Sequence, residues 1–270
     1  NLSASITPVR MGYSGHGREE VKGHVIVLTD ITREKSLEEE RDEFISVVSH
    51  ELRTPITIAE GNISNAQLVL QKSGLKQQAI HSALEGAHSQ IIFLSGMIND
   101  LSMLSRAERG KLTVDIESIN AHGVIKELEN TYRPDIEAKG LKLKVEIDPR
   151  LERLQSSRLY LREILQNFIT NAIKYTDHGS IVLSAKQRKE GVVFSVIDTG
   201  IGISKSDQKK LFHKFFRSEA YRTRGTTGTG LGLYINMKLA RLLHAEINVN
   251  SELGHGSEFS VMVPHTPGHD

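Results

Sequence analysis

The segment 49–55, SHELRTP, brings a nucleophile, a carboxylate and a hydroxyl within about two helical turns. Histidine, here His50, offers a ring nitrogen that can act as a nucleophile. Glu51 follows directly and can hold one ring nitrogen, which leaves the other free to attack an electrophile. Thr54 lies one turn further on the same face, where its hydroxyl could orient a water molecule. A solvated surface histidine is the alternative, since the chain has 12 histidines.

A second set of polar residues shares one face of a predicted helix over 158–175. Asn167, Asn171, Lys174 and Tyr175 follow one another at spacings of four, three and one. An amide oxygen can bind Mg²⁺ when phosphates and water fill the other positions. A lysine supplies a point charge for phosphate, and an aromatic ring can cover a base. The alternative is an ordinary amphipathic helix with a polar face.

Two glycine-rich segments follow. Asp198, Gly200 and Gly202 come directly after a predicted strand, where a carboxylate can accept the amino proton of adenine. Glycines there let the backbone approach a flat ligand without interference from a Cβ atom. The second segment opens a helix, whose free backbone N–H groups suit a phosphate. Its residues are Gly228, Thr229, Gly230, Leu231 and Gly232.

Between these segments lies 212–217, FHKFFR, whose phenylalanines we expect to be mostly core. Arg217 is a candidate contact for a terminal phosphate. The polar stretch 218–228 is typical of a mobile lid, in which Arg222 and Arg224 would be solvated charges.

The segment SHELRTP resembles the phospho-acceptor box of the sensor histidine kinases of two-component systems. The later segments resemble the asparagine, glycine and phenylalanine boxes of that family, in the usual order over about residues 33–265. The resemblance implies that His50 is phosphorylated, Asn171 binds Mg²⁺ and Asp198 reads adenine. The remaining polar and glycine-box residues would then line the ATP site, and Glu51 and Thr54 would assist kinase and phosphatase chemistry.

Two departures from the family pattern concern turns. The chain has Ser156-Ser157-Arg158 before the asparagine-box helix, where an aspartate is frequent, and we expect serine to cap the helix instead. It has His244-Ala245 where a pair of glycines is frequent, which should alter a turn and leave the site intact.

The elements that position His50 are two long helices. Apolar residues recur every three, four or seven positions from Leu37 to Leu70 and from Ile80 to Leu101, with a break at Ser73-Gly74. These stripes predict a helical hairpin, and two hairpins would bury them in a dimeric four-helix bundle. The alternative is that both helices pack on the remainder of their own chain.

The remainder of the chain predicts an α/β sandwich with a mixed sheet. Strands are expected at 112–117, 141–147, 180–186, 192–198, 246–251 and 257–263, and helices at 120–138, 158–175 and 231–243. We therefore expect a sensor-domain fragment at 1–32, the helical hairpin at 33–110 and the ATP-binding domain at 111–270. The resemblance extends to 1–32, which looks like the end of a PAS domain with a strand near Val25–Leu28 and a helix cap at Asp30 or Thr32.

Composition excludes several classes of protein. The chain has 270 residues, 38% of them hydrophobic, a net charge of +1 and no cysteine. That balance argues against a dedicated nucleic-acid binder, and the lack of cysteine removes disulfides and thiolate sites. The sequence has no run of 18 apolar residues that would predict a membrane helix. We therefore expect a cytoplasmic portion of a longer protein, in which a membrane anchor could lie upstream.

The resemblance implies a homodimeric, Mg²⁺- and ATP-dependent histidine kinase that phosphorylates a response regulator and dephosphorylates it as well. A phosphatase-only protein or an ATP-driven dimeric scaffold with the same ATPase fold is the alternative. The segment SHELRTP favours the kinase, because the related gyrase-type and chaperone ATPases lack it.

Overall fold

The structure is a computed structural model that describes residues 2–11, 20–71, 77–218 and 228–265. It divides into two compact units, Asn1–Leu94 and Ser95–Asp270. The boundary falls within one long helix. The expected break at Ser73-Gly74 and most of the expected lid at 218–228 lie outside the described residues.

The first unit begins with an antiparallel ribbon of β1 (Leu2–Met11) and β2 (Glu20–Asp30). The sequence predicted only the apolar part of β2. Val25, Ile26, Val27 and Leu28 are each more than half exposed, so neither face of β2 is covered over this stretch. The side chain of Asp30 then accepts the backbone N–H of Thr32 at 2.9 Å, which supports the start of the next helix.

That helix is α1 (Thr32–Gln71), and α2 (Gln77–Glu108) returns beside it, as the heptad-like spacing predicted. Four alanines are buried between the two helices, and at Gly86 an added Cβ would lie 2.9 Å from Nδ2 of Asn62. Small residues therefore allow the two helices to approach closely. The buried alanines are Ala59, Ala66, Ala83 and Ala87. The larger apolar residues Ile56, Ile63, Leu84 and Ile91 remain 40–51% exposed.

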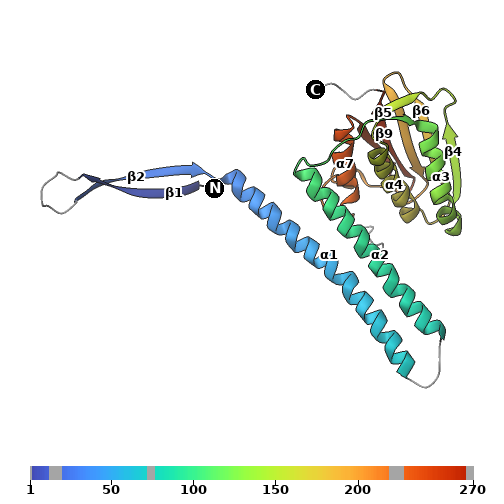
Figure 1. Ribbon diagram of the computed structural model, residues 1–270, viewed down its shortest axis with the longest axis horizontal. Coiled ribbons are helices and arrows are strands. Elements are labelled where there is room, and N and C mark those ends of the chain that lie inside the picture. The colour runs from blue at the N-terminus through green and yellow to red at the C-terminus, as the bar shows by residue number, and fades with distance from the viewer. Residues whose placement is uncertain (1, 12–19, 72–76, 219–227, 266–270) are drawn as a thin grey trace. The chain divides into compact units, whose positions relative to one another are not determined.

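The second unit contains the end of α2 and an α/β domain (Figure 1). Its helices are α3 (Ala121–Ala138), α4 (Arg158–Tyr175), the short α5 (Lys205–Gln208) and α7 (Gly232–Leu242). Its strands are β3 (Glu117–Asn120), β4 (Lys142–Ile147), β5 (Arg153–Ser156), β6 (Ser180–Gln187), β7 (Gly191–Asp198), β8 (Glu246–Glu252) and β9 (Gly256–Pro264).

Five strands form one mixed sheet in the order β4-β6-β7-β9-β8, in which only the β4–β6 pair is parallel. Helices α3, α4 and α7 cover the sheet, so the core lies between two layers (Figure 1). Phe168 of α4 contacts Phe259 of β9 with ring centroids 5.4 Å apart. The predicted α/β sandwich with a mixed sheet is therefore correct.

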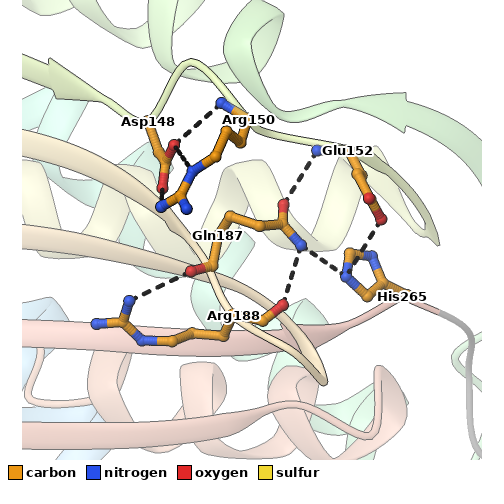
Figure 2. Close-up of polar contacts among 6 residues, drawn as sticks. All are labelled: Asp148, Arg150, Glu152, Gln187, Arg188 and His265. Atoms are coloured by element: carbon orange, nitrogen blue, oxygen red, sulfur yellow. Dashed lines mark hydrogen bonds and ion pairs between the residues drawn. The ribbon is translucent and has the colours of Figure 1, made fainter.

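A polar network joins the ends of β6 and β9 to the loop before β5 (Figure 2). The Gln187 side chain accepts the backbone N–H of Glu152, and its amide nitrogen donates to the Arg188 carbonyl and to Nε2 of His265 at 2.8 Å. Arg150 forms a two-pronged ion pair with Asp148, which lowers the pKa of that carboxyl to about 2. The network ties the loop 148–152 to the sheet.

Two local predictions were wrong. The alternating segment 112–117 is irregular up to Ile116, and the strand there is β3, which pairs with the unpredicted β5. Alternation marks an extended chain, but a strand also needs a partner with free hydrogen-bonding groups. Ser157 does occupy the N-cap position of α4, but its side chain makes no capping hydrogen bond.

At the far end of α7, His244 adopts a left-handed conformation with φ 51°, so the absence of glycine does alter that turn, as the sequence predicted.

Candidate functional site

His50 lies on α1 with its side chain 75% exposed. Its Nδ1 is 3.4 Å from Oε1 of Glu51, a contact that pairs the carboxylate with that nitrogen. When Nδ1 carries the proton, the lone pair of Nε2 is free to act as a nucleophile. The structure thus brings these two residues together as the sequence predicted.

Thr54 and Pro55 follow on the next turn of α1. The Thr54 hydroxyl donates to the backbone carbonyl of His50 at 3.3 Å, and the residue is exposed. Pro55 is buried inside the helix and cannot donate to the carbonyl of Glu51. The Thr54 oxygen therefore sits one turn from the imidazole and keeps the capacity to accept a hydrogen bond.

On α4, Asn167 and Asn171 form a connected amide pair. Nδ2 of Asn171 donates to Oδ1 of Asn167 at 3.0 Å. Because the amide nitrogen of Asn171 faces Asn167, its oxygen is the atom that it can offer to a cation. Asn236 of α7 is buried and donates to the carbonyl of Ile164 at 3.1 Å and to Oδ1 of Asn167 at 3.4 Å. This buried amide fixes the orientation of Asn167, and the sequence analysis did not identify it.

Lys174 is the cation of this site. Its Nζ lies 4.6 Å from the centre of the Tyr175 ring and close to Gly228, where an added Cβ would be only 2.6 Å from that nitrogen. Burial, and to a lesser degree the nearby positive charge of Arg217, together lower the pKa of Lys174 to about 8. Burial also raises the pKa of Tyr175. A buried cation next to a second cation is stabilised when an anion arrives, which suits a phosphate site.

Asp198 ends β7 and is 7% exposed. Its Oδ1 accepts the backbone N–H of Gly200 at 2.8 Å, while burial raises the pKa of the carboxyl. The hydroxyl of Thr176 is fully buried beside Gly200 and has no hydrogen-bond partner in the described part of the chain. A carboxylate and an unpaired hydroxyl at one spot suit a ligand that both donates and accepts hydrogen bonds, such as a purine base.

Several glycines of this site pack closely against neighbouring groups. An added Cβ would lie 2.3 Å from the Tyr175 carbonyl at Gly200, and 2.0 Å from Nδ2 of Asn167 at Gly232. Gly202 lies apart from these groups, because its close neighbour is the carbonyl of Glu252 in β8. Its role is therefore to let two backbones pass.

The second glycine-rich segment begins beside Lys174 and leads into α7. Gly230 has φ 69° and packs against the backbone of Phe215, so a side chain has no room there. Thr229 accepts the backbone N–H of Leu231 at 3.2 Å and donates to Asp100 of α2 at 3.0 Å. The sequence did not indicate this contact with α2.

Taken together, these groups fit a magnesium–nucleotide complex. The unpaired Thr176 hydroxyl and Asp198 lie together beside Gly200, Lys174 lies beside Gly228, and the Asn171 amide is held by Asn167. Thr176 directly follows Tyr175 in the sequence, but a threonine at a helix end is too common to predict this role. The polar Asn236 on the otherwise apolar stripe of α7 was the one visible clue to the support behind Asn167.

Two family models match the chain. Residues 40–110 match the His Kinase A (phospho-acceptor) domain. Residues 156–267 match the histidine kinase-, DNA gyrase B- and HSP90-like ATPase. His50 lies in the first match, and the candidate site residues from Asn167 to Gly232 lie in the second.

Curated relatives and solved structures agree with these matches. The chain is 34% identical over 235 residues to the autoinducer 2 sensor kinase/phosphatase LuxQ of Vibrio vulnificus, covering 83% of this chain and 26% of that protein. It is 30% identical over 263 residues to the aerobic respiration control sensor protein ArcB of Escherichia coli, covering 96% and 32%. The chain thus spans about a quarter to a third of these relatives.

Among solved structures, full-length ShkA in complex with AMPPNP has a TM-score of 0.61 and 25% identity, covering 84% of this chain and 47% of that one. In the described ranges, none of the helices is both long and apolar enough to cross a membrane.

Proposed function

We propose that this chain, which belongs to the sensor histidine kinases, moves the γ-phosphoryl group of ATP to His50 and then to an aspartate of a separate response regulator. The observation that carries the proposal is the pairing of Nδ1 of His50 with Glu51, which leaves Nε2 free on an exposed imidazole. The close-packed glycines and the unpaired Thr176 hydroxyl of the second unit support a nucleotide site there.

In the first step, Nε2 of His50 attacks the γ-phosphorus and the bond from that phosphorus to the β,γ-bridging oxygen breaks, so ADP leaves. The imidazole becomes positively charged as the N–P bond forms, and Glu51 accepts the Nδ1 proton. Phosphoryl transfer depends mainly on position and charge neutralisation. Lys174 and the N-terminal end of α7 would supply charge to the phosphates, and Asp198 with Thr176 would hold the base.

Mg²⁺, when bound, would neutralise phosphate charge, and the amide oxygen of Asn171 is the ligand that this chain offers to it. Asn167 holds the Asn171 amide nitrogen at 3.0 Å, and Asn236 in turn holds Asn167. Arg217 adds positive charge near Lys174 and would approach the transferred phosphate.

The second step and the later dephosphorylation of the regulator involve the surface around His50. Transfer to an aspartate carboxylate regenerates the free imidazole. The exposed hydroxyl of Thr54 would orient the water that later hydrolyses the regulator's acyl phosphate. The relative LuxQ is named a sensor kinase/phosphatase, which favours both activities here.

We further propose that the hairpin of α1 and α2 forms a homodimer. Ile56, Ile63, Leu84 and Ile91 are 40–51% exposed on the single chain although they belong to the heptad-like stripes. Burying such side chains against a second copy would contribute roughly 1 kcal/mol each. Ile63→Asp should therefore shift the protein from dimer to monomer in light scattering, and an unchanged mass would contradict this interface.

We propose, finally, that the ribbon of β1 and β2 is the end of an upstream PAS-like sensor domain. Its Val25–Leu28 stretch is more than half exposed on every residue, as expected for a piece whose core lies elsewhere. Because β2 is followed at once by α1, a change in the sensor would reach His50 through a single helix.

The test is incubation of the chain with γ-labelled Mg·ATP, followed by treatment with acid and with alkali. We expect a label that survives alkali, is lost in acid and is absent from His50→Gln. The matched control is Asn171→Ala, which should lose the label together with nucleotide binding, whereas His50→Gln should still bind nucleotide. Nucleotide binding without any label would favour a phosphatase-only protein or a scaffold.

A further inference from the structure

A chain of hydrogen bonds joins α2 to the start of α7 within the second unit. Oγ1 of Thr229 donates to Oδ2 of Asp100 at 3.0 Å and accepts the backbone N–H of Leu231 at 3.2 Å. Because the hydroxyl proton is given to the carboxylate, the oxygen lone pair is free to accept that N–H. Asp100 therefore determines how the second glycine-rich segment is held, although it lies 129 positions away in the sequence.

These hydrogen bonds end at the start of α7, a position that matters for an anionic ligand. Helix α7 begins at Gly232 and runs for 11 residues, and Leu231 is its N-cap residue. The first N–H groups of such a helix are free to bind an anion and carry partial positive charge. In this structure the Leu231 N–H is used by Thr229, and the anion behind Thr229 is Asp100. The Asp100 carboxylate is thus linked to the start of α7 through a single hydroxyl group.

The surroundings of the Asp100 carboxylate disfavour its charged form. Burial raises the pKa of Asp100, the bond from Thr229 opposes that rise, and the negative charge of Glu163 adds to it. A further anion at the start of α7 would be repelled by this partly buried charge, because the surrounding protein screens charges less than water does. Asp100 and nucleotide phosphates therefore disfavour each other at this segment.

We propose that Asp100 is a positioning residue that holds the second glycine-rich segment through Thr229 in the nucleotide-free protein and competes there with nucleotide phosphates. The inference rests on the proposed function, in which nucleotide binds at this segment. By linkage, nucleotide binding then weakens the bond between α2 and the segment, and release of that bond favours nucleotide binding to the same degree. Nucleotide binding would in this way change how tightly α2 is held to the second glycine-rich segment.

The test is the affinity for AMPPNP, measured by titration calorimetry on the full chain. Asp100→Asn keeps an acceptor of the same shape but removes the charge, so its bond to Thr229 weakens and the repulsion is lost. We expect about five-fold tighter binding, since hydrogen bonds to charged groups are stronger than neutral ones. An unchanged or weaker affinity in a folded Asp100→Asn protein would overturn the proposal, and Asp100→Ser gives the same test if the first variant fails to fold.

Two controls separate this effect from a general loosening of α2. Glu108 forms an ion pair with Lys214 at 2.6 Å, so Glu108→Gln also removes a charge that joins α2 to the α/β domain, but one that is held by Lys214 and not by Thr229. Glu85→Gln removes a charge from the same helix in the first unit. Both should bind AMPPNP within about two-fold of the unmodified chain. A gain in Glu108→Gln equal to that of Asp100→Asn would contradict a specific competition.

The role of Thr229 is tested by a double-mutant cycle. In a Thr229→Val background the Asp100→Asn change should alter the AMPPNP affinity by much less than in the unmodified chain, because the connecting hydroxyl is gone. Equal effects in both backgrounds would refute the hydrogen-bond path. If the unmodified chain does not bind AMPPNP at all, the proposed function itself is wrong, an outcome distinct from binding that Asp100→Asn leaves unchanged.

Discussion

The protonation of Lys174 should control nucleotide affinity in an unusual pH range. Burial and the charge of Arg217 lower the pKa of this lysine to about 8 in the free protein. A bound triphosphate would favour the charged form and return the pKa toward or above its ordinary value. The protonated form therefore binds nucleotide better, and affinity must fall as pH rises through 8.

The size of this effect follows from the free pKa. If the pKa in the complex lies above about 10, Mg·AMPPNP should bind about ten-fold more weakly at pH 9 than at pH 7. Below pH 7 the affinity should be independent of this group. Tyr175, whose pKa burial raises, stays neutral across the same range.

Calorimetric titrations over about three pH units, from about pH 6.5 to about pH 9.5, would measure this dependence. Lys174→Arg keeps a permanent charge and should remove the decline, because the guanidinium does not deprotonate. Lys174→Met should bind roughly ten- to a hundred-fold more weakly at pH 7 and show no decline. A decline of the same size in Lys174→Met would refute the assignment of the titrating group.

Three further changes test separate parts of the structure. Thr54→Ala should reduce dephosphorylation of the regulator but spare autophosphorylation, as measured with labelled phosphate; an equal loss of both would mean that Thr54 serves only the helix. His244→Gly should stabilise the catalytic domain by about 1 kcal/mol in urea unfolding, since His244 has φ 51°. Gln187→Leu should destabilise it by roughly 1–3 kcal/mol, because it leaves the Glu152 N–H and the Arg188 carbonyl without their partner. No loss in Gln187→Leu would mean that water replaces that network.

Periodic elements were well predicted by the sequence. The helix expected at 158–175 matches α4 at both ends, because a long amphipathic pattern specifies a buried face. Short elements were poorly predicted by the sequence. β5 has a single buried apolar residue, Leu154, and it exists because β3 pairs with it. The alternating segment before β3 is instead held by the Tyr160 hydroxyl, which donates to the Thr113 carbonyl at 2.8 Å.

The candidate site also contains residues that the sequence could identify and residues that it could not. Residues grouped within one segment, such as Asn167, Asn171 and Lys174, could be identified from their spacing on one helix. Thr176, Asn236 and Asp100 could not, because their importance arises from contacts with residues far away in the chain. A sequence pattern reveals which groups share an element, whereas the partners of a buried polar group depend on how the elements pack.

The location of the phosphoryl group within His50 tests the central claim most directly. The contact of Nδ1 with Glu51 predicts that phosphate from ATP is attached to Nε2. Phosphorus and nitrogen NMR of the chain phosphorylated by Mg·ATP, together with peptide mapping under alkaline conditions, would identify both the residue and the nitrogen. We expect phosphate on Nε2 of His50 alone. Phosphate on Nδ1, or on any residue other than His50, would contradict the mechanism.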